Sequence, residues 1–102
     1  MSSSYEKYIS SFELSTKMML VRLRQDFKNN QTVFDDGFLS LNIYSHNKEK
    51  QVKVETILLQ PPYMNVHIVN GKRLVSHRVS FSDAYTDQFC DKVMVTVLGM
   101  FR

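Results

Sequence analysis

Large apolar residues recur at helical spacing over Ser4 to Asn30, a stretch that contains neither Gly nor Pro. They fall at the i, i+3, i+4 and i+7 positions that are typical of an amphipathic helix. This main stripe comprises Tyr5, Tyr8, Ile9, Phe12, Leu20, Leu23 and Phe27, with Met19 beside it and Thr16 as its weakest member. We expect either one helix of about 38 Å, which would overhang a compact body of this chain length, or two shorter helices separated near Ser10 and Ser11.

The same segment carries a second apolar strip, about half a turn away from the main stripe. It consists of Leu14, Met18 and Val21, which stand at i, i+4 and i+7. A helix that is apolar on two sides must bury both of them within its own chain or present one of them to another chain. The strip therefore predicts either a cover from a later segment or an interface, such as a seam between two copies of the helix.

Alternating apolar and polar residues after the helix predict strands. Gln31 to Gly37 is expected to be a connector, with a turn at Asp35-Asp36-Gly37. Leu39, Leu41 and Ile43 alternate with polar or aromatic residues, which predicts a strand over residues 38–45. A second strand is expected over residues 52–59, where Pro61-Pro62 follows because proline cannot donate to a sheet.

Asn70-Gly71 between two alternating segments is a strong hairpin signal. If these two residues form the turn, two cross-strand pairs follow: Val69 with Lys72, and Val66 with Val75. One face of the hairpin then carries Met64, Val66, Ile68, Val75, His77 and Val79. The opposite face is mostly polar, as expected for a sheet that is covered on one side only.

The C-terminal segment is compatible with two structures. Asp83 and the helical spacing of Tyr85, Phe89, Val93 and Val97 indicate a helix, and we expect a short one over about residues 83–91 with Ser82 as its N-cap. The β-branched residues that follow favour a strand over about residues 93–98, and one long helix is the alternative. The predicted fold class is α+β. A long N-terminal helix packs on an antiparallel β-meander of four to five strands, with a short C-terminal helix, a strand or both.

Composition restricts the class of protein. A chain of 102 residues, 43% hydrophobic, is expected to form one domain over residues 1–102. It has no apolar run long enough to span a membrane and no secretory leader pattern. The single cysteine cannot form an internal disulfide, which predicts an intracellular, reducing compartment such as cytoplasm or nucleus. The scarcity of Ala, Gly and Pro is typical of an AT-rich genome, such as that of a virus or phage.

The side chains that carry chemistry form no recognisable catalytic or metal-binding motif. His46, His67 and His77 lack the spacing of a metal site, and Cys90 has no expected base near it. His77 is expected to be a core or interface residue. We therefore expect no enzymatic activity, no metal, no cofactor and no small-molecule substrate.

The net charge of +3 at pH 7 is concentrated, on the predicted topology, at one end of the sheet. The residues that would contact an anion or a nucleic acid are Lys48, Lys50, Lys53, Lys72, Arg73 and Arg78. Phe38 and Tyr44 are expected on the outer sheet face near them, where bases could stack. This pattern predicts a nucleic-acid-binding domain as an alternative function.

The favoured hypothesis is a small protein-interaction module without catalytic activity. It would act as an adaptor, a structural subunit or an inhibitor of a larger protein. Its interface residues would be Leu14, Met18 and Val21, and it is expected to form a homodimer through the helix or the C-terminal segment.

Overall fold

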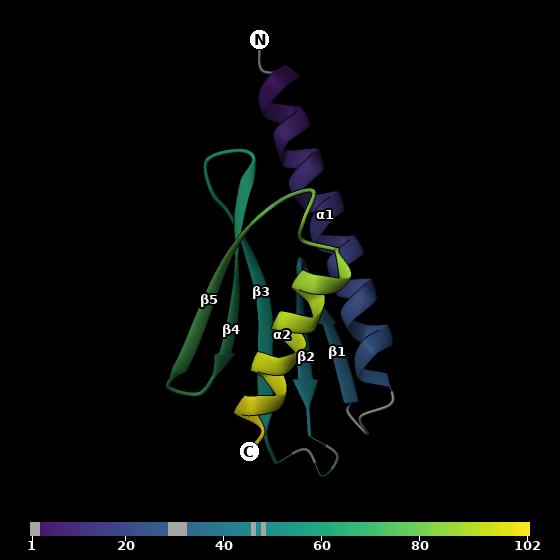
Figure 1. Ribbon diagram of the computed structural model, residues 1–102, viewed down its shortest axis with the longest axis vertical. Helices are drawn as coiled ribbons and strands as arrows, with labels where there is room; N and C mark the ends of the chain where they lie inside the picture. The colour runs from purple at the N-terminus through teal and green to yellow at the C-terminus, as the bar shows by residue number, and fades with distance from the viewer. Residues whose placement is uncertain (1–2, 29–32, 46, 48) are drawn as a thin grey trace.

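The computed structural model describes residues 3–28, 33–45, 47 and 49–102, which form an α+β fold (Figure 1). Helix α1 (Ser3–Phe27) precedes the β-strands in the chain, and helix α2 (Asp87–Met100) follows them. The strands are β1 (Val33–Gly37), β2 (Ser40–Tyr44), β3 (Gln51–Leu58), β4 (Tyr63–Asn70) and β5 (Arg73–Ser80). The predicted fold class is confirmed.

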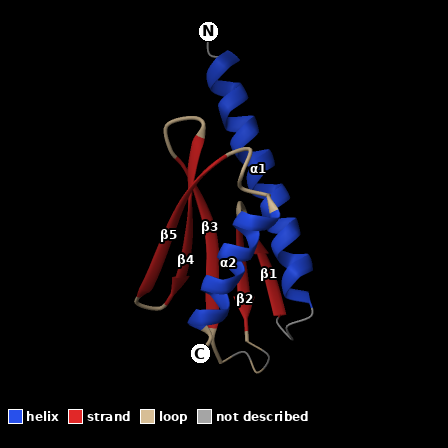
Figure 2. Cartoon of the chain, in the orientation of Figure 1, coloured by secondary structure: helices blue, strands red, loops and turns tan. Residues whose placement is uncertain are grey.

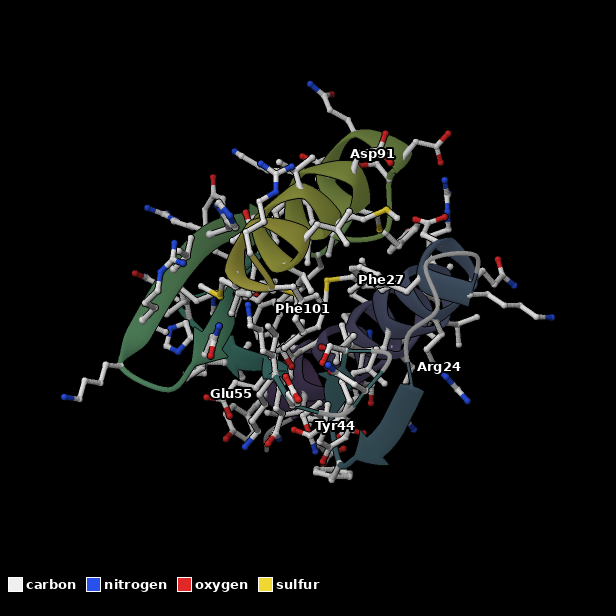
Figure 3. The ribbon with its side chains drawn as sticks, turned by 90° about the horizontal axis from the view of Figure 1, so that it is seen from below. Arg24, Phe27, Tyr44, Glu55, Asp91 and Phe101 are labelled. Atoms are coloured by element: carbon white, nitrogen blue, oxygen red, sulfur yellow. The ribbon has the colours of Figure 1, made fainter. Side chains whose placement is uncertain are left out.

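Strands β2 to β5 form an antiparallel meander, and β1 extends the sheet along its β2 edge. Both helices lie on the same face of this sheet, side by side (Figure 2). The face away from them carries polar and aromatic side chains, and Figure 3 shows Tyr44 and Glu55 on that side. The sheet is thus covered on one face by the described residues, as the alternating pattern predicted.

The predicted turn at Asp35-Asp36-Gly37 is wrong, because these residues belong to β1. Gly37 pairs with Ser40, so the turn falls at Phe38 and Leu39, and Leu39 takes a left-handed φ of 54°. A Cβ atom on Gly37 would collide with Ser40 Oγ, so a larger residue here would require the Ser40 side chain to rotate. The strand predicted over residues 38–45 accordingly begins only at Ser40.

The β4–β5 hairpin is confirmed, but its predicted register is wrong by two residues. The turn is formed by Gly71 and Lys72, Asn70 pairs with Arg73, and Val66 pairs with His77. Gly71 has φ 57°, a value that glycine adopts without strain. An error of two residues preserves the side on which each side chain lies, so the predicted apolar face is correct.

The hydrophobic core lies between the sheet and the two helices. From α1 it receives Phe12, Met19, Leu20, Leu23 and Phe27, which are all buried. The sheet contributes mainly Leu41, Ile43, Val52, Val54, Met64, Val66 and Ile68. Thr16 is also fully buried in this layer, where its hydroxyl donates to Thr56 Oγ1 over 3.1 Å. The weakest member of the main stripe is therefore satisfied by a hydrogen bond to β3.

Helix α1 is continuous, so the predicted alternative of a break near Ser10 and Ser11 is wrong. It projects beyond the sheet at its N-terminal end (Figure 1), and the molecule measures 50 × 26 × 23 Å. Tyr5 and Tyr8 at this end are exposed, although they belong to the main stripe. The expected overhang is confirmed.

The predicted strand over residues 93–98 is wrong, because α2 is one helix up to Met100. Its N-cap is Thr86 rather than Ser82, and Thr86 Oγ1 accepts a hydrogen bond from the Phe89 amide. Burial of Phe89, Cys90, Val93, Val97 and Met100 at helical spacing outweighs the strand propensity of the valines.

The C-terminal end of α2 is fixed to the sheet by two hydrogen bonds. Lys50 Nζ donates to the Phe101 carbonyl over 2.6 Å, and Asn70 Nδ2 donates to the Met100 carbonyl over 2.7 Å. The last carbonyls of a helix lack intrahelical partners and carry partial negative charge. Lys50, which was predicted as an anion contact, therefore has a structural role here.

Candidate protein-binding surface

The second apolar side of α1 is exposed on the folded protein. Leu14, Met18 and Val21 retain 60%, 42% and 50% of their accessible surface. We call these three residues the α1 strip. No described segment covers it, so the prediction of an internal cover is wrong for the described part of the chain.

The α1 strip has the spacing of a helix–helix seam. Ser11, Leu14, Met18, Val21, Gln25 and Lys28 follow one another at alternating intervals of three and four. This is the a/d spacing along which two helices pack. Shallow depressions lie along it, one lined by Lys17, Met18 and Val21, and another by Val21, Arg24, Gln25 and Lys28. A partner side chain could enter either depression.

The border of the α1 strip is basic. Lys17, Arg24 and Lys28 are exposed along one side of it. Figure 3 shows Arg24 on the outside of α1, away from the interior where Phe27 lies. Exposed apolar side chains with a basic border are suited to a partner that offers apolar side chains flanked by carboxylates.

The orientation of α1 is fixed by contacts on the side facing α2. Arg22 donates to Asp26 one turn later over 3.2 Å, and also to Asp87 in the first turn of α2. These hydrogen bonds raise the pKa of Arg22 further above its usual range, with Asp87 the larger cause. Together with the buried main stripe, they hold the α1 strip on a rigid helix.

A second concave surface lies between α2 and β5. It is a groove of about 790 Å³ whose lining includes His77, Val79, Phe89, Lys92, Val95 and Thr96. His77 Nε2 forms a hydrogen bond with Thr96 Oγ1 over 3.2 Å, and its ring meets that of Phe89 edge-on at 6.3 Å. The His77 ring thus connects the strand with the helix, in agreement with the predicted core or interface role.

We expect the stability of the protein to fall as the pH drops below about 6.5. Burial, and secondly Lys92, lowers the pKa of His77 from its ordinary value of 6.5. The unfolded chain therefore binds a proton at a higher pH than the folded one, and acid favours unfolding. The lost stability should level off once the pH lies below the folded-state pKa.

Urea unfolding at about pH 7.5 and about pH 5.5 measures this effect. The difference between the two midpoints should be smaller in His77→Gln, which keeps a hydrogen-bonding side chain but does not titrate. His67 and the groove carboxylates Asp83 and Asp91 are unchanged in the variant. The difference between the two chains therefore reports the contribution of His77 alone. An equal pH dependence of the two chains would contradict the role assigned to His77.

The described basic residues that were predicted to contact nucleic acid have different surroundings. Lys50 binds the end of α2, and Lys53 pairs with Glu55 at 3.3 Å. Lys72 and Arg73 are exposed at the β4–β5 turn, while the Arg78 guanidinium lies 4.1 Å from the centre of the Tyr63 ring. Lys48 and His46 lie outside the described residues. Binding of nucleic acid by this set stays a prediction.

The predicted aromatic platform is only partly in place. Tyr44 lies on the outer sheet face, but Phe38 stands in the β1–β2 turn with 81% of its surface exposed. Phe38 was expected on the strand beside Tyr44, and the later start of β2 explains the difference.

Cys90 is a packing residue in this structure. Its side chain is fully buried, and its thiol donates to the Ala84 carbonyl over 3.6 Å. Burial is the main cause that raises the pKa of the thiol to about 11. A thiol held in the protonated form and shielded from solvent is poorly suited to nucleophilic attack.

The described residues contain no group of three or more His, Cys, Asp or Glu side chains placed to hold a metal ion. None of the helices in the described part of the chain combines the length and apolarity needed to cross a membrane. No protein-family model matches the sequence, and comparisons with curated proteins and with solved structures give no match.

Sequence reasoning identified the α1 strip but missed the groove and the exposed Val95 on its rim. The groove depends on α2 being a helix, and the prediction of a strand at residues 93–98 concealed it. The repeated interval from Phe89 to Val93 to Val97, which supported the alternative of one long helix, was the signal for it, but the β-branched residues were given more weight.

Proposed function

We propose that this chain is a small, non-catalytic protein-interaction module that binds another protein through the α1 strip. The exposure of Leu14, Met18 and Val21 on a rigid helix is the observation that carries the proposal. Contiguous apolar side chains on a folded surface, bordered by polar ones, mark interaction sites. An adaptor, a structural subunit or an inhibitor of a larger protein would all use such a surface.

The partner expected at the α1 strip is an amphipathic helix with an apolar seam and acidic flanks. The strip has helix–helix spacing, and Lys17 and Lys28 border it. In a parallel pair of α1 helices, Lys17 and Lys28 of one copy would lie close to the same residues of the other. The apolar part also covers only one heptad, whereas a self-sufficient coiled coil needs three to four. These points favour a different protein over a second copy at this surface.

The reducing compartment predicted from the single cysteine is part of the same proposal. Cys90 is buried as a thiol, which agrees with an intracellular protein whose cysteine is structural.

A designed peptide provides a test that does not require the natural partner. A helical peptide of three heptads, with Leu at a and d and Glu at e and g, should bind the protein in fluorescence anisotropy. A second peptide with Lys in place of Glu should bind much more weakly, because its charges meet the basic border. The Leu14→Glu, Met18→Glu double variant should weaken binding of the acidic peptide by about tenfold or more.

The control is the Phe38→Glu, Ile57→Glu double variant, which introduces the same charge change at exposed apolar residues of the turn and the outer sheet face. It should bind the acidic peptide nearly as well as the unmodified chain. Equal weakening by both double variants would show that net charge alone governs binding, and the proposed role of the α1 strip would be wrong.

A further inference from the structure

The two edges of the sheet differ in how they are protected against pairing with another strand. β1 is five residues long and ends at Gly37. β5 is eight residues long, contains neither Pro nor Gly, and carries its charges at Arg73 and Arg78. Short edge strands and strands interrupted by Pro or Gly discourage edge-to-edge association, whereas a long uninterrupted strand permits it. β5 is therefore the edge at which the sheet could be extended.

Register determines which backbone groups of β5 face outward. The Phe81 amide donates to the Pro62 carbonyl over 2.9 Å, in line with the β4–β5 pairing. In an antiparallel pair, hydrogen-bonded and non-hydrogen-bonded positions alternate. The odd-numbered residues of β5 consequently bond to β4, and the N–H and C=O groups of Leu74, Ser76 and Arg78 point away from the sheet.

α2 contacts β5 through Thr96 and Phe89, which both meet the His77 ring. The main packing of α2 is against α1 and β4, and the groove beside it is lined on the β5 side by His77 and Val79. Val95 on its rim keeps 71% of its surface exposed, and Leu74 on the opposite sheet face is also exposed. A sixth strand would cover apolar side chains on both faces while pairing the outward backbone groups.

We propose that a second copy of this chain occupies this edge, with the two β5 strands antiparallel about a two-fold axis at Ser76. The sheet then continues from one protomer into the other. This interface involves neither Leu14, Met18 nor Val21, so it is independent of the function proposed for the α1 strip. It differs from the homodimer predicted from the sequence, which was expected through the N-terminal helix or the C-terminal segment rather than through β5.

Side-chain complementarity favours this register. With Ser76 opposite its own copy, the other facing pairs are Leu74 with Arg78, Val75 with His77, and Arg73 with Val79. No two like charges then face each other directly. A register centred on Val75 would set Lys72 against Arg78, and one centred on His77 would place the two His77 rings against each other.

The helices above the sheet also suit a two-fold arrangement. Adjacent strands lie about 4.8 Å apart, so helices above the two copies of β4 would be about 14 Å apart. Val95 adjoins Thr96, whose hydroxyl contacts His77 close to the proposed axis. The two copies of Val95 would therefore approach each other there. Lys92 lies one turn away from Val95, so the two copies of Lys92 would be offset along the helices.

Substitution of Ser76 by charged residues tests this interface. Light scattering coupled to size exclusion measures the mass of each variant. At high micromolar concentration the unmodified chain and Ser76→Ala should be dimers. Ser76→Lys and Ser76→Asp should each be monomers, because like charges would lie opposite each other at the axis. An equimolar mixture of the two should restore the dimer, which misfolded chains could not do.

A monomeric unmodified chain would overturn the proposal, as would a Lys or Asp variant that remains dimeric or a mixture that remains monomeric. The Leu14→Glu, Met18→Glu variant should keep the dimer mass. Loss of the dimer in that variant would place the interface on α1 and would also contradict pairing along β5.

Discussion

Leu23→Ala should lower the free energy of unfolding by about 3 kcal/mol, within the range of 2–5 kcal/mol that is typical of buried leucines. Leu23 is completely buried near the C-terminal end of α1, in the layer between helix and sheet. Its truncation removes apolar contacts and leaves a cavity that a well-packed core closes only in part. The loss is large relative to the 5–15 kcal/mol by which domains are usually stable.

Leu14→Ala is the matched control, because it makes the same chemical change on the opposite face of the same helix. Leu14 is 60% exposed, so its truncation should change stability by less than about 0.5 kcal/mol. Urea unfolding of both variants, followed by circular dichroism, measures the difference. Similar losses in the two variants would mean that the α1 strip is buried in solution.

Val97→Ala should cost about 2 kcal/mol, whereas Val95→Ala should be nearly neutral. Val97 is fully buried, while Val95 lies on the outer side of α2. In a helix these two positions point in different directions, but in a strand they would share one face. Alanine is also the better helix former, which offsets the small decrease in apolar packing at Val95.

The unfolding of both valine variants should be measured at low protein concentration, because self-association along β5 then contributes least to stability. Equal destabilisation by the two substitutions would indicate the strand predicted from the sequence at residues 93–98. A difference of about 2 kcal/mol would indicate the helix.

The sequence was sufficient to predict elements that have strong and long periodic patterns. The main stripe of α1 and the alternating strands from β2 to β5 were assigned correctly because each buries one side against the same core. The side of the sheet on which a residue lies was predicted more reliably than its partner on the neighbouring strand. The hairpin register was wrong by two residues, yet Met64, Val66 and Ile68 were still assigned to the covered side.

The remaining errors arose where local preference and tertiary packing disagree. Asp35, Asp36 and Gly37 have the composition of a turn, but the chain reverses two residues later, where Leu39 accepts a positive φ. The valines of α2 have strand propensity, but Val93 and Val97 reach the core only when the segment is helical. Neither outcome follows from a local window of sequence.

The sequence was sufficient to predict that Leu14, Met18 and Val21 form an apolar strip on α1. It was not sufficient to predict that the strip is exposed, because this depends on where α2 packs. Arg22 contacts the first turn of α2 on the opposite flank of α1 from Lys17. The C-terminal helix therefore covers the sheet beside α1 and leaves Leu14, Met18 and Val21 open. A second helix on the other side of α1 would have buried them.

The most direct measurement of the proposed function is the mapping of amide chemical shifts in two-dimensional NMR spectra during titration with the acidic peptide. The shifts should concentrate at Leu14, Met18, Val21 and their basic neighbours, and residues of β2 to β5 should be little affected. Shifts concentrated on the outer sheet face or in the groove beside β5 would contradict binding at the α1 strip. The absence of any shift at saturating peptide would contradict it as well.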